Sequence, residues 1–235
     1  MSKIAVIIPA YNEQDAIADV VRSLRKVAID NGLQLDVVVI NDCSTDSTAE
    51  IISTLPCIAL NLPVNLGIGG AVQTGFKYAY NNNYDYAVQV DGDGQHPAEE
   101  IPKLVNALEK NNWDVVIGSR FFDNKGFQST FLRRTGIGFF RFLNRILVGV
   151  DIKDSTSGFR MINKKALELV NEYYPDEYPE PEAIVLFAKN DLRIGETSVV
   201  MRDRQGGVSS IGRSASIYYM FKVSLAVIFT FIKTK

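Results

Sequence analysis

The strongest constraint on the fold is a series of short apolar runs that alternate with segments of helical spacing. Five runs are short, apolar and mostly rich in β-branched residues, as buried strands are: 3–10, 35–42, 57–62, 84–91 and 113–120. Segments with helical spacing or with Ser, Thr and Asp caps lie between them: 13–30, 44–52, 68–81 and 98–111. Strands that alternate with helices predict an α/β fold, a mostly parallel sheet with helices on both faces.

Polar clusters follow four of these predicted strands, at the point where each strand ends. They are YNE at 11–13, NDCSTD at 41–46, DGDGQ at 91–95 and GSR at 118–120. In an open parallel sheet, ligands bind outside the carboxyl ends of the strands. The sequence therefore predicts one site at this edge, to which all four clusters contribute.

The stretch DGDGQHP at 91–97 has three interpretations. A calcium-binding EF-hand loop would need glycine at its sixth position and glutamate at its twelfth, but His96 and Pro102 stand there. A simple turn fits the Asp-Gly pairs, but it does not explain two acids at the ligand edge. The remaining interpretation is a divalent cation that links carboxylates to a diphosphate.

Other phosphate-binding and nucleophile fingerprints do not fit. The glycine-rich segment 66–75 has Val72 where G-x-G-x-x-G needs glycine, and it lacks the Gly-Lys-Ser/Thr of a P-loop. The chain also has no G-x-S-x-G nucleophile elbow. A kinase or a dehydrogenase is therefore unsupported.

Charge is distributed unevenly along the chain. Residues 1–112 carry seven Lys and Arg against fourteen Asp and Glu, whereas residues 116–145 carry six basic residues against Asp123. This asymmetry suggests a metal-binding half followed by a half that faces phosphate or membrane, although charge clusters are often only solvated faces. Two cysteines form no disulfide framework, and the N-terminus has no signal-peptide pattern, so we expect a cytosolic protein.

Two segments are candidates for membrane contact. Residues 216–232 are apolar apart from Lys222 and a few hydroxyls, at the short end of the length that spans a bilayer. We expect an interfacial helix there; a helix packed on the core and a true span are the alternatives. Residues 131–148 place arginines among Phe and Leu, which predicts a basic amphipathic helix on a membrane.

Taken in order, the motifs resemble family 2 glycosyltransferases with the GT-A (Rossmann-like) fold. The matching segments are PAYNE (9–13), NDCSTD (41–46), NLGIGGA (65–71), DGDGQHP (91–97), GSRF (118–121) and DSTSGFR (154–160). The chain is most similar to the polyprenyl-phosphate and dolichol-phosphate hexosyltransferases, over about residues 3–210. The resemblance implies a GT-A domain at 1–212 and a membrane-associating apolar segment at 213–235.

The resemblance also implies a donor site and a cation site. Donor-binding residues would be Pro9, Tyr11, Glu13, Asp42 and Asp91, with Asp42 on the nucleotide base. Mg²⁺ or Mn²⁺ on the diphosphate would be held by Asp93 and Gln95, with Asp91 nearby. Asp93 would be catalytic as the central ligand of this DXD motif.

On the acceptor side, the resemblance implies that Arg120 and Arg134 grip a phosphate, for which a guanidinium is well shaped. Arg133 would assist, and Ser157 and Arg160 would shape the acceptor pocket. An acceptor hydroxyl would instead require a general base, for which Glu182 is the candidate.

Two positions depart from the family pattern. Relatives commonly have Asp-Asp-Gly-Ser where this chain has Asn41, Asp42, Cys43 and Ser44, so we expect Cys43 to have a backbone conformation acceptable to a residue with a side chain. Ile68 stands where relatives often have a basic residue. Both changes lie on the nucleotide side.

The predicted function is metal-dependent transfer of a hexose from a UDP- or GDP-sugar to polyprenyl phosphate at the cytosolic membrane face. The resemblance implies inversion at the anomeric carbon. Two alternatives remain: a GT-A enzyme that glycosylates a sugar hydroxyl of a growing polysaccharide, and a nucleotide-sugar-binding or nucleotidyltransferase-like protein. We expect no nucleic-acid partner, and a homo-oligomer or a small membrane-protein partner stays open.

Overall fold

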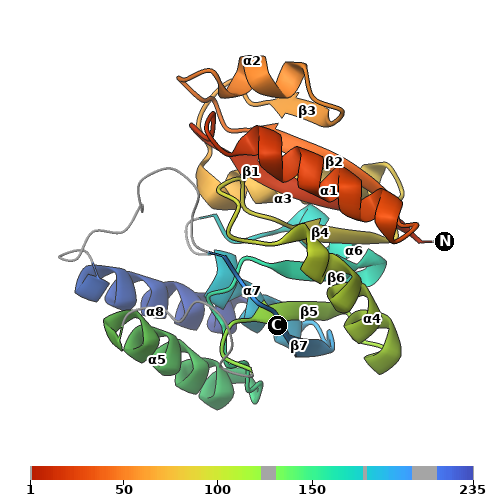
Figure 1. Ribbon diagram of the computed structural model, residues 1–235. Helices are drawn as coiled ribbons and strands as arrows, with labels where there is room; N and C mark the ends of the chain where they lie inside the picture. Colours follow the sequence, from red (N-terminus) through yellow and green to blue (C-terminus); the bar gives the residue numbers. More distant parts are fainter. Residues whose placement is uncertain (1, 123–130, 177–178, 203–215, 235) are drawn as a thin grey trace.

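The computed structural model describes residues 2–122, 131–176, 179–202 and 216–234, and at 131–135 and 216–219 it describes the helical backbone only. Within these residues, seven strands form one sheet in the order β3-β2-β1-β4-β6-β5-β7 (Figure 1). The strands are β1 (Lys3–Ala10), β2 (Gln34–Asn41), β3 (Ile58–Asn61), β4 (Tyr86–Gln89), β5 (Val115–Ser119), β6 (Arg160–Asn163) and β7 (Ile194–Ser198).

Helices connect the strands and cover both faces of the sheet (Figure 1). They are α1 (Ile17–Asp30), α2 (Thr48–Ser53), α3 (Gly67–Asn81), the short 3-10 helix η1 (Ala98–Glu100), α4 (Ile101–Asn111), α5 (Phe131–Val148), α6 (Lys164–Glu172), α7 (Pro179–Lys189) and α8 (Ser216–Lys233). The five predicted strands are β1 to β5, and the predicted helix at 131–148 is α5.

The sheet is mostly parallel, as predicted. Strands β1, β2, β3 and β4 pair in parallel, and so do β5 and β7. Strand β6 runs antiparallel to both β4 and β5. The carboxyl ends of β1, β2, β4 and β5 therefore meet at one edge of the sheet, where the four polar clusters follow.

The apolar run of β1 is continuous because both of its faces are buried. Ile4, Val6 and Ile8 pack with residues of α1 and α4, whereas Ala5 and Ile7 pack on the other face with residues of α3, α6 and α7. Burial of one large aliphatic side chain contributes about 1.5–3 kcal/mol. These two layers hold the strand ends in register.

Helix α3 approaches β1 closely at Gly75. A Cβ atom at this position would lie 2.1 Å from Cγ2 of Ile7. Only glycine permits this approach, and it brings the start of α3 close to the ends of β1 and β2.

Helices α5 and α8 lie side by side, away from the β3 end of the sheet (Figure 1). They share a small core with α7, formed by Phe140, Val185, Val223 and Val227. The predicted C-terminal segment at 213–235 thus contains a helix with one side packed on the domain. No helix among the described residues is both long and apolar enough to cross a bilayer.

Candidate active site

The loops that follow β1 and β2 are hydrogen-bonded to each other. Asn12 has a left-handed backbone (φ 56°), donates its N–H to Oγ of Ser44 at 3.0 Å, and accepts the Thr45 N–H at 2.8 Å. The N–H of Glu13 donates to Oγ1 of Thr48 at 2.9 Å. The motifs PAYNE and NDCSTD therefore form one unit, and Asn12 is a residue of this unit that the sequence did not single out.

The predicted donor-binding residues lie on or beside this unit. Pro9 is buried in β1, Tyr11 is 49% exposed at the end of that strand, and Glu13 is half-buried. Asp42 is buried and its carboxylate accepts the N–H groups of Leu66 at 2.7 Å and Gly67 at 2.9 Å. These N–H groups open α3, where the helix dipole favours a negative charge. Asp42 therefore ties the end of β2 to the start of α3.

Cys43 has a left-handed backbone with φ of 59°. This differs from the expectation of a conformation acceptable to a side chain, because left-handed backbone favours glycine, the residue that relatives commonly have at this position. A side chain in this conformation costs about 1–2 kcal/mol. The turn between β2 and α2 therefore carries local backbone strain.

The two acids after β4 have different surroundings. The Asp91 side chain is 35% exposed, whereas Asp93 is 3% exposed and its Oδ1 accepts the N–H of Gln95 at 3.0 Å. Gly94 between Asp93 and Gln95 has φ of 78°, a conformation that side chains rarely adopt. The loop thus presents one partly exposed carboxylate and one buried carboxylate.

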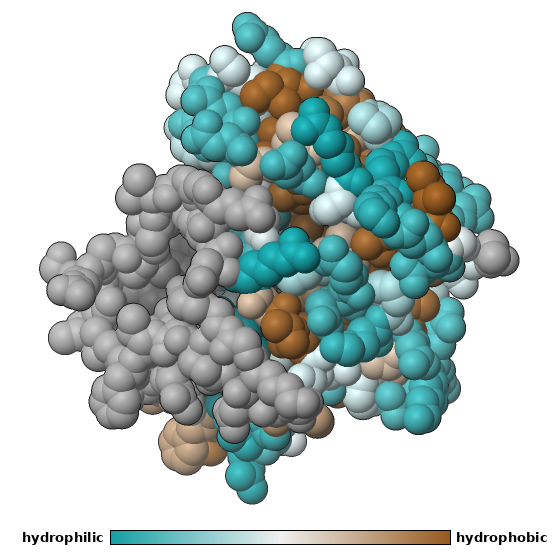
Figure 2. Space-filling view, viewed as in Figure 1, coloured by the Kyte–Doolittle hydropathy of each residue, from teal (hydrophilic) through white to brown (hydrophobic). Residues whose placement is uncertain are grey.

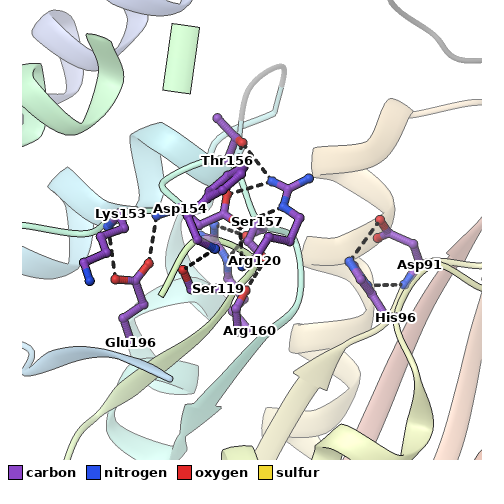
Figure 3. Close-up of polar contacts among 12 residues, drawn as sticks. Asp91, His96, Ser119, Arg120, Lys153, Asp154, Thr156, Ser157, Arg160 and Glu196 are labelled. Atoms are coloured by element: carbon purple, nitrogen blue, oxygen red, sulfur yellow. Dashed lines mark hydrogen bonds and ion pairs between the residues drawn. The ribbon is translucent and has the colours of Figure 1, made fainter. Parts of the chain in front are cut away.

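His96 and Gln89 hold Asp91 from two sides. His96 accepts the Asp91 N–H on Nδ1 at 3.0 Å, and its Nε2 lies 3.6 Å from Oδ2 of Asp91 (Figure 3). Nε2 of Gln89 donates to Oδ1 of Asp91 at 3.4 Å. The His96 ring also stacks on Phe159, with ring centroids 4.9 Å apart. No local sequence pattern indicated that His96 and Gln89 contact Asp91.

This loop has the donor chemistry for Mg²⁺ or Mn²⁺. Both ions prefer hard oxygen ligands and are often held by one or two carboxylates, with substrate phosphates completing the shell. Asp91 and Asp93 supply such oxygens, and the buried Oε1 of Gln89 has no hydrogen-bond partner among the described residues. The described residues contain no cluster of three His, Cys, Asp or Glu side chains able to hold a metal alone. The residues fit a cation whose shell a bound diphosphate completes.

Arg120, directly after β5, is buried against Asp154. Nε donates to Oδ2 of Asp154 and Nη2 to Oδ1, both at 2.7 Å, and the Arg120 N–H donates to Oδ2 at 3.1 Å (Figure 3). Burial alone would lower the pKa of Arg120, but the hydrogen bonds and charge of Asp154 outweigh it and raise that pKa. Asp91 raises it further. The cationic side chain is therefore fixed near the acidic loop.

Ser157 and Arg160 are built into the scaffold beneath Arg120. Ser157 donates its hydroxyl to the Gly118 carbonyl at 2.7 Å, and its own carbonyl accepts Nη2 of Arg160 at 2.7 Å. Arg160 is fully buried. The predicted acceptor-shaping role of both residues would thus be exerted through the loop they hold. Arg133 and Arg134 lie in α5, and their side chains are outside the described residues.

Glu182 and Glu180 point to different surroundings. Glu182 is buried and accepts the Thr230 hydroxyl at 3.1 Å, which directs it toward α8. Burial raises the pKa of Glu180, partly offset by the charge of Arg160, and Asp91 raises it further. The Glu180 carbonyl accepts Nη1 of Arg160 at 3.2 Å, so Glu180 lies beside the scaffold that Arg160 holds. Residues two apart on a helix point in nearly opposite directions. Helix periodicity alone therefore indicates that Glu180 and Glu182 face different sides of the helix.

Polar side chains that gather at the carboxyl ends of parallel strands form the usual ligand-binding edge of an open α/β protein. A family model described as glycosyl transferase family 2 matches residues 5–170. The chain belongs to this family and is a family 2 glycosyltransferase, as the motifs predicted.

Individual relatives agree with the family. The UDP-N-acetylglucosamine–dolichyl-phosphate N-acetylglucosaminyltransferase of Methanococcus voltae is 33% identical over 219 residues, covering 83% of this chain and 84% of the relative. The dolichol-phosphate mannosyltransferase of Pyrococcus furiosus is 36% identical over 177 residues, covering 71% of this chain but 47% of the relative.

A solved structure shares the fold. Glucosyl-3-phosphoglycerate synthase from Mycobacterium tuberculosis, crystallised with Mn²⁺, UDP and its product, has a TM-score of 0.70 at 19% identity. The match covers 99% of this chain and 80% of the synthase. This likeness confirms the GT-A type of α/β architecture.

Proposed function

We propose that this enzyme transfers a hexose or a related sugar from a nucleoside diphosphate sugar to a polyprenyl phosphate, with Mg²⁺ or Mn²⁺ as cofactor. One observation carries the proposal: the buried guanidinium of Arg120 follows β5 and the acidic loop with Asp91 and Asp93 follows β4, at the same edge of the sheet (Figure 3). One edge of the sheet thus offers oxygen ligands for a cation and a fixed positive charge for an anion. The names of the Methanococcus and Pyrococcus relatives support a lipid-phosphate acceptor.

The acidic residues would bind the cation, and the basic residues would bind the acceptor phosphate. Asp93, Gln95 and Asp91 would hold the cation, which when bound supplies Lewis-acid stabilisation of the departing diphosphate. Arg120, with Arg134 and Arg133, would orient the acceptor phosphate. A phosphate is already anionic near neutral pH and needs orientation more than a general base. Asp154 holds Nε and Nη2 of Arg120 and so sets the orientation in which the guanidinium would meet a phosphate.

The donor would lie across the ends of β1 and β2. Tyr11 is the exposed aromatic side chain there, and Pro9, Glu13 and Asp42 would border the nucleotide. Asp42 already accepts two backbone N–H groups, so a base would use the remaining lone pairs of its carboxylate.

We further propose that α5 and α8 rest on the cytosolic face of a membrane. Each helix has an exposed apolar stripe on the side away from their shared core: Phe139, Phe142 and Ile146 on α5, and Phe221, Leu225, Phe229 and Ile232 on α8. Apolar atoms are visible at the lower edge of Figure 2, where α5 lies in Figure 1. Residues 131–148 and 216–235 contain no Asp or Glu, which suits an anionic lipid surface.

Vesicle sedimentation tests the membrane proposal. Binding to vesicles with an anionic lipid should weaken when Phe221 and Phe229 are both replaced by Ser. Replacing the exposed Ile29 of α1, on a different face, by Ser is the matched control. Equal binding of all three proteins would contradict a docking role for α8.

The acceptor proposal is tested by incubating the enzyme with labelled nucleotide sugars, a polyprenyl phosphate and Mg²⁺ or Mn²⁺, followed by organic extraction. Label should enter the organic phase with at least one donor. Asp93→Ala should abolish this transfer, whereas Asp19→Ala, which removes an exposed acid of α1, should not. The proposal is wrong if no donor labels the lipid, or if Asp93→Ala transfers sugar at the normal rate.

A hydroxyl acceptor is the second candidate, favoured by Glu180. Its raised pKa is a property of a general base, and its carbonyl is bonded to Arg160 in the scaffold beneath Arg120. If a hydroxyl is the acceptor, Glu180→Gln should abolish transfer; if a phosphate is the acceptor, transfer should persist at a reduced rate. The earlier candidate Glu182 should matter mainly for the stability of the α7–α8 contact.

A further inference from the structure

Asp154, the partner of Arg120, is itself held by Glu196, a partly buried carboxylate with no role in the site described so far. Asp154 is fully buried in the loop before β6, and Glu196 lies on β7. Neither stands at a position where the cation or the nucleotide is expected. Their contacts nevertheless form a chain that ends at Arg120.

Glu196 fixes the backbone of the loop. Its Oε2 accepts the N–H of Lys153 at 3.1 Å and its Oε1 accepts the N–H of Asp154 at 2.8 Å (Figure 3). The Ser119 hydroxyl also hydrogen-bonds this carboxyl. Both oxygens of Glu196 thus hold consecutive peptide groups of one turn.

Asp154, whose backbone Glu196 holds, in turn holds the side chain of Arg120. Its carboxylate meets the guanidinium edge-on through two bonds of 2.7 Å and also accepts the Arg120 N–H. Thr156 takes a further contact from Nη2 at 3.2 Å. A bidentate pair of this kind sets the plane of the guanidinium as well as its position.

We propose that Glu196 is a positioning residue for acceptor binding, which aims Arg120 at the acceptor phosphate through the turn that carries Asp154. This inference rests on the proposed function, in which Arg120 meets that phosphate. Glu196 does not touch the acceptor itself. Its effect is therefore expected in acceptor binding and not in donor binding.

The opposite end of the same strands supplies a matched control. Asp114 precedes β5, is buried, and accepts the Arg193 N–H at 2.7 Å and Nδ2 of Asn163 at 2.9 Å. It is also a buried carboxylate that holds backbone, but it lies at the edge away from the site. Asp114→Asn tests the cost of losing such a carboxylate without any effect on Arg120.

The first experiment compares Glu196→Gln with Asp114→Asn in steady-state kinetics. Glutamine turns one acceptor oxygen into an amide donor that faces a peptide N–H, so the turn should shift. In Glu196→Gln, the acceptor KM should rise about tenfold while nucleotide binding stays unchanged. Asp114→Asn should leave the acceptor KM unchanged. Equal changes in both variants, or an unchanged KM in Glu196→Gln, would overturn the inference.

A double-mutant cycle tests whether the effect runs through Arg120. In an Arg120→Lys background, Glu196→Gln should have little further effect on the acceptor KM, because the guanidinium that Glu196 positions is absent. A full tenfold effect in that background would show that Glu196 acts by another route. If Glu196→Gln folds poorly, Glu196→Asp keeps the charge but is too short to reach both N–H groups, and the same comparison applies.

A measurement without substrate separates this inference from the proposed function. The Arg120 Nε–H should exchange slowly with water in ¹⁵N-arginine NMR spectra, because the buried ion pair protects it. Faster exchange in Glu196→Gln but not in Asp114→Asn supports the link, whatever the acceptor proves to be. Unchanged exchange overturns it. Failure of the unmodified enzyme to label any polyprenyl phosphate counts against the proposed function only.

Discussion

The two sides of the strand-end edge hold their charged groups by different means. On the donor side, the carboxylates of Asp42 and Asp93 are held by backbone N–H groups. On the acceptor side, Arg120 is held by another side chain, Asp154, which is itself buried. Backbone N–H groups fix the position of a carboxylate, whereas the bidentate pair of Arg120 and Asp154 fixes the plane of the guanidinium as well. The proposed donor side thus takes its geometry from backbone groups, and the proposed acceptor side from a buried pair of side chains.

The largest expected effect tests the acceptor side. Asp154→Ala leaves the buried Arg120 without its partner, so the free energy of unfolding should fall by about 3–5 kcal/mol. Denaturant unfolding monitored by circular dichroism measures this loss. The double variant Arg120→Met/Asp154→Leu should lose much less, because it removes both charges together. A loss below about 1 kcal/mol in Asp154→Ala would mean that this pair behaves like an exposed one.

The donor side should be less sensitive to the loss of one carboxylate. Asp42→Ala removes an acceptor for two N–H groups at the start of α3, which should cost about 1.5–3 kcal/mol. Asp42→Asn keeps one acceptor oxygen and should cost less, in the same unfolding assay. If Asp42→Ala proves as destabilising as Asp154→Ala, the contrast between backbone-held and side-chain-held groups is lost.

The same contrast explains what the sequence could predict. The strands β1 to β5 and the four polar clusters could be predicted because apolar runs and the points where they end are local patterns. The donor-side contacts join loops that follow two of these predicted strands, β1 and β2. The contacts around Arg120 instead involve the loop before β6 and the strand β7, neither of which was among the predicted strands. Strand β6 has only four residues and includes a buried arginine, so neither its apolar pattern nor its antiparallel direction was visible. Asp154 lies within the recognised motif DSTSGFR, but no local pattern indicated that it pairs with Arg120.

The choice between Glu182 and Glu180 shows a further limit. Both acids lie at the start of α7, and only the packing of α7 against α8 decides which of them turns inward to Thr230. That packing depends on Val185, Val223 and Val227, which are distant in sequence. Helix periodicity separates the two faces, but it does not say which face meets the site.

Cys43 offers a smaller test within the donor side. Cys43→Gly should relieve the strain of a left-handed backbone at φ 59° and so raise the free energy of unfolding by about 1 kcal/mol. The greater conformational entropy of glycine in the unfolded chain offsets part of this gain. Cys43→Ser keeps a side chain and should show no such gain. A decrease in stability on Cys43→Gly would indicate that the Cys43 side chain, half-buried near the Pro63 carbonyl, contributes more than the strain it imposes.

The smallest expected effect depends on pH and concerns Asp46. Burial works to raise its pKa, but hydrogen bonds from the Thr48 hydroxyl and N–H and from the Gln14 N–H outweigh burial, so the pKa is lowered. A lowered pKa in the folded state means that Asp46 stabilises the protein above its unfolded pKa of about 3.9, and that this stability is lost as the pH falls through the folded pKa. Asp46→Asn should therefore cost about 1 kcal/mol or less at pH 7, and the difference should shrink below about pH 4. Unfolding of both proteins between pH 7 and pH 3 measures the difference, and a gap that widens on acidification would show that the hydrogen bonds of this loop do not favour the ionised carboxylate.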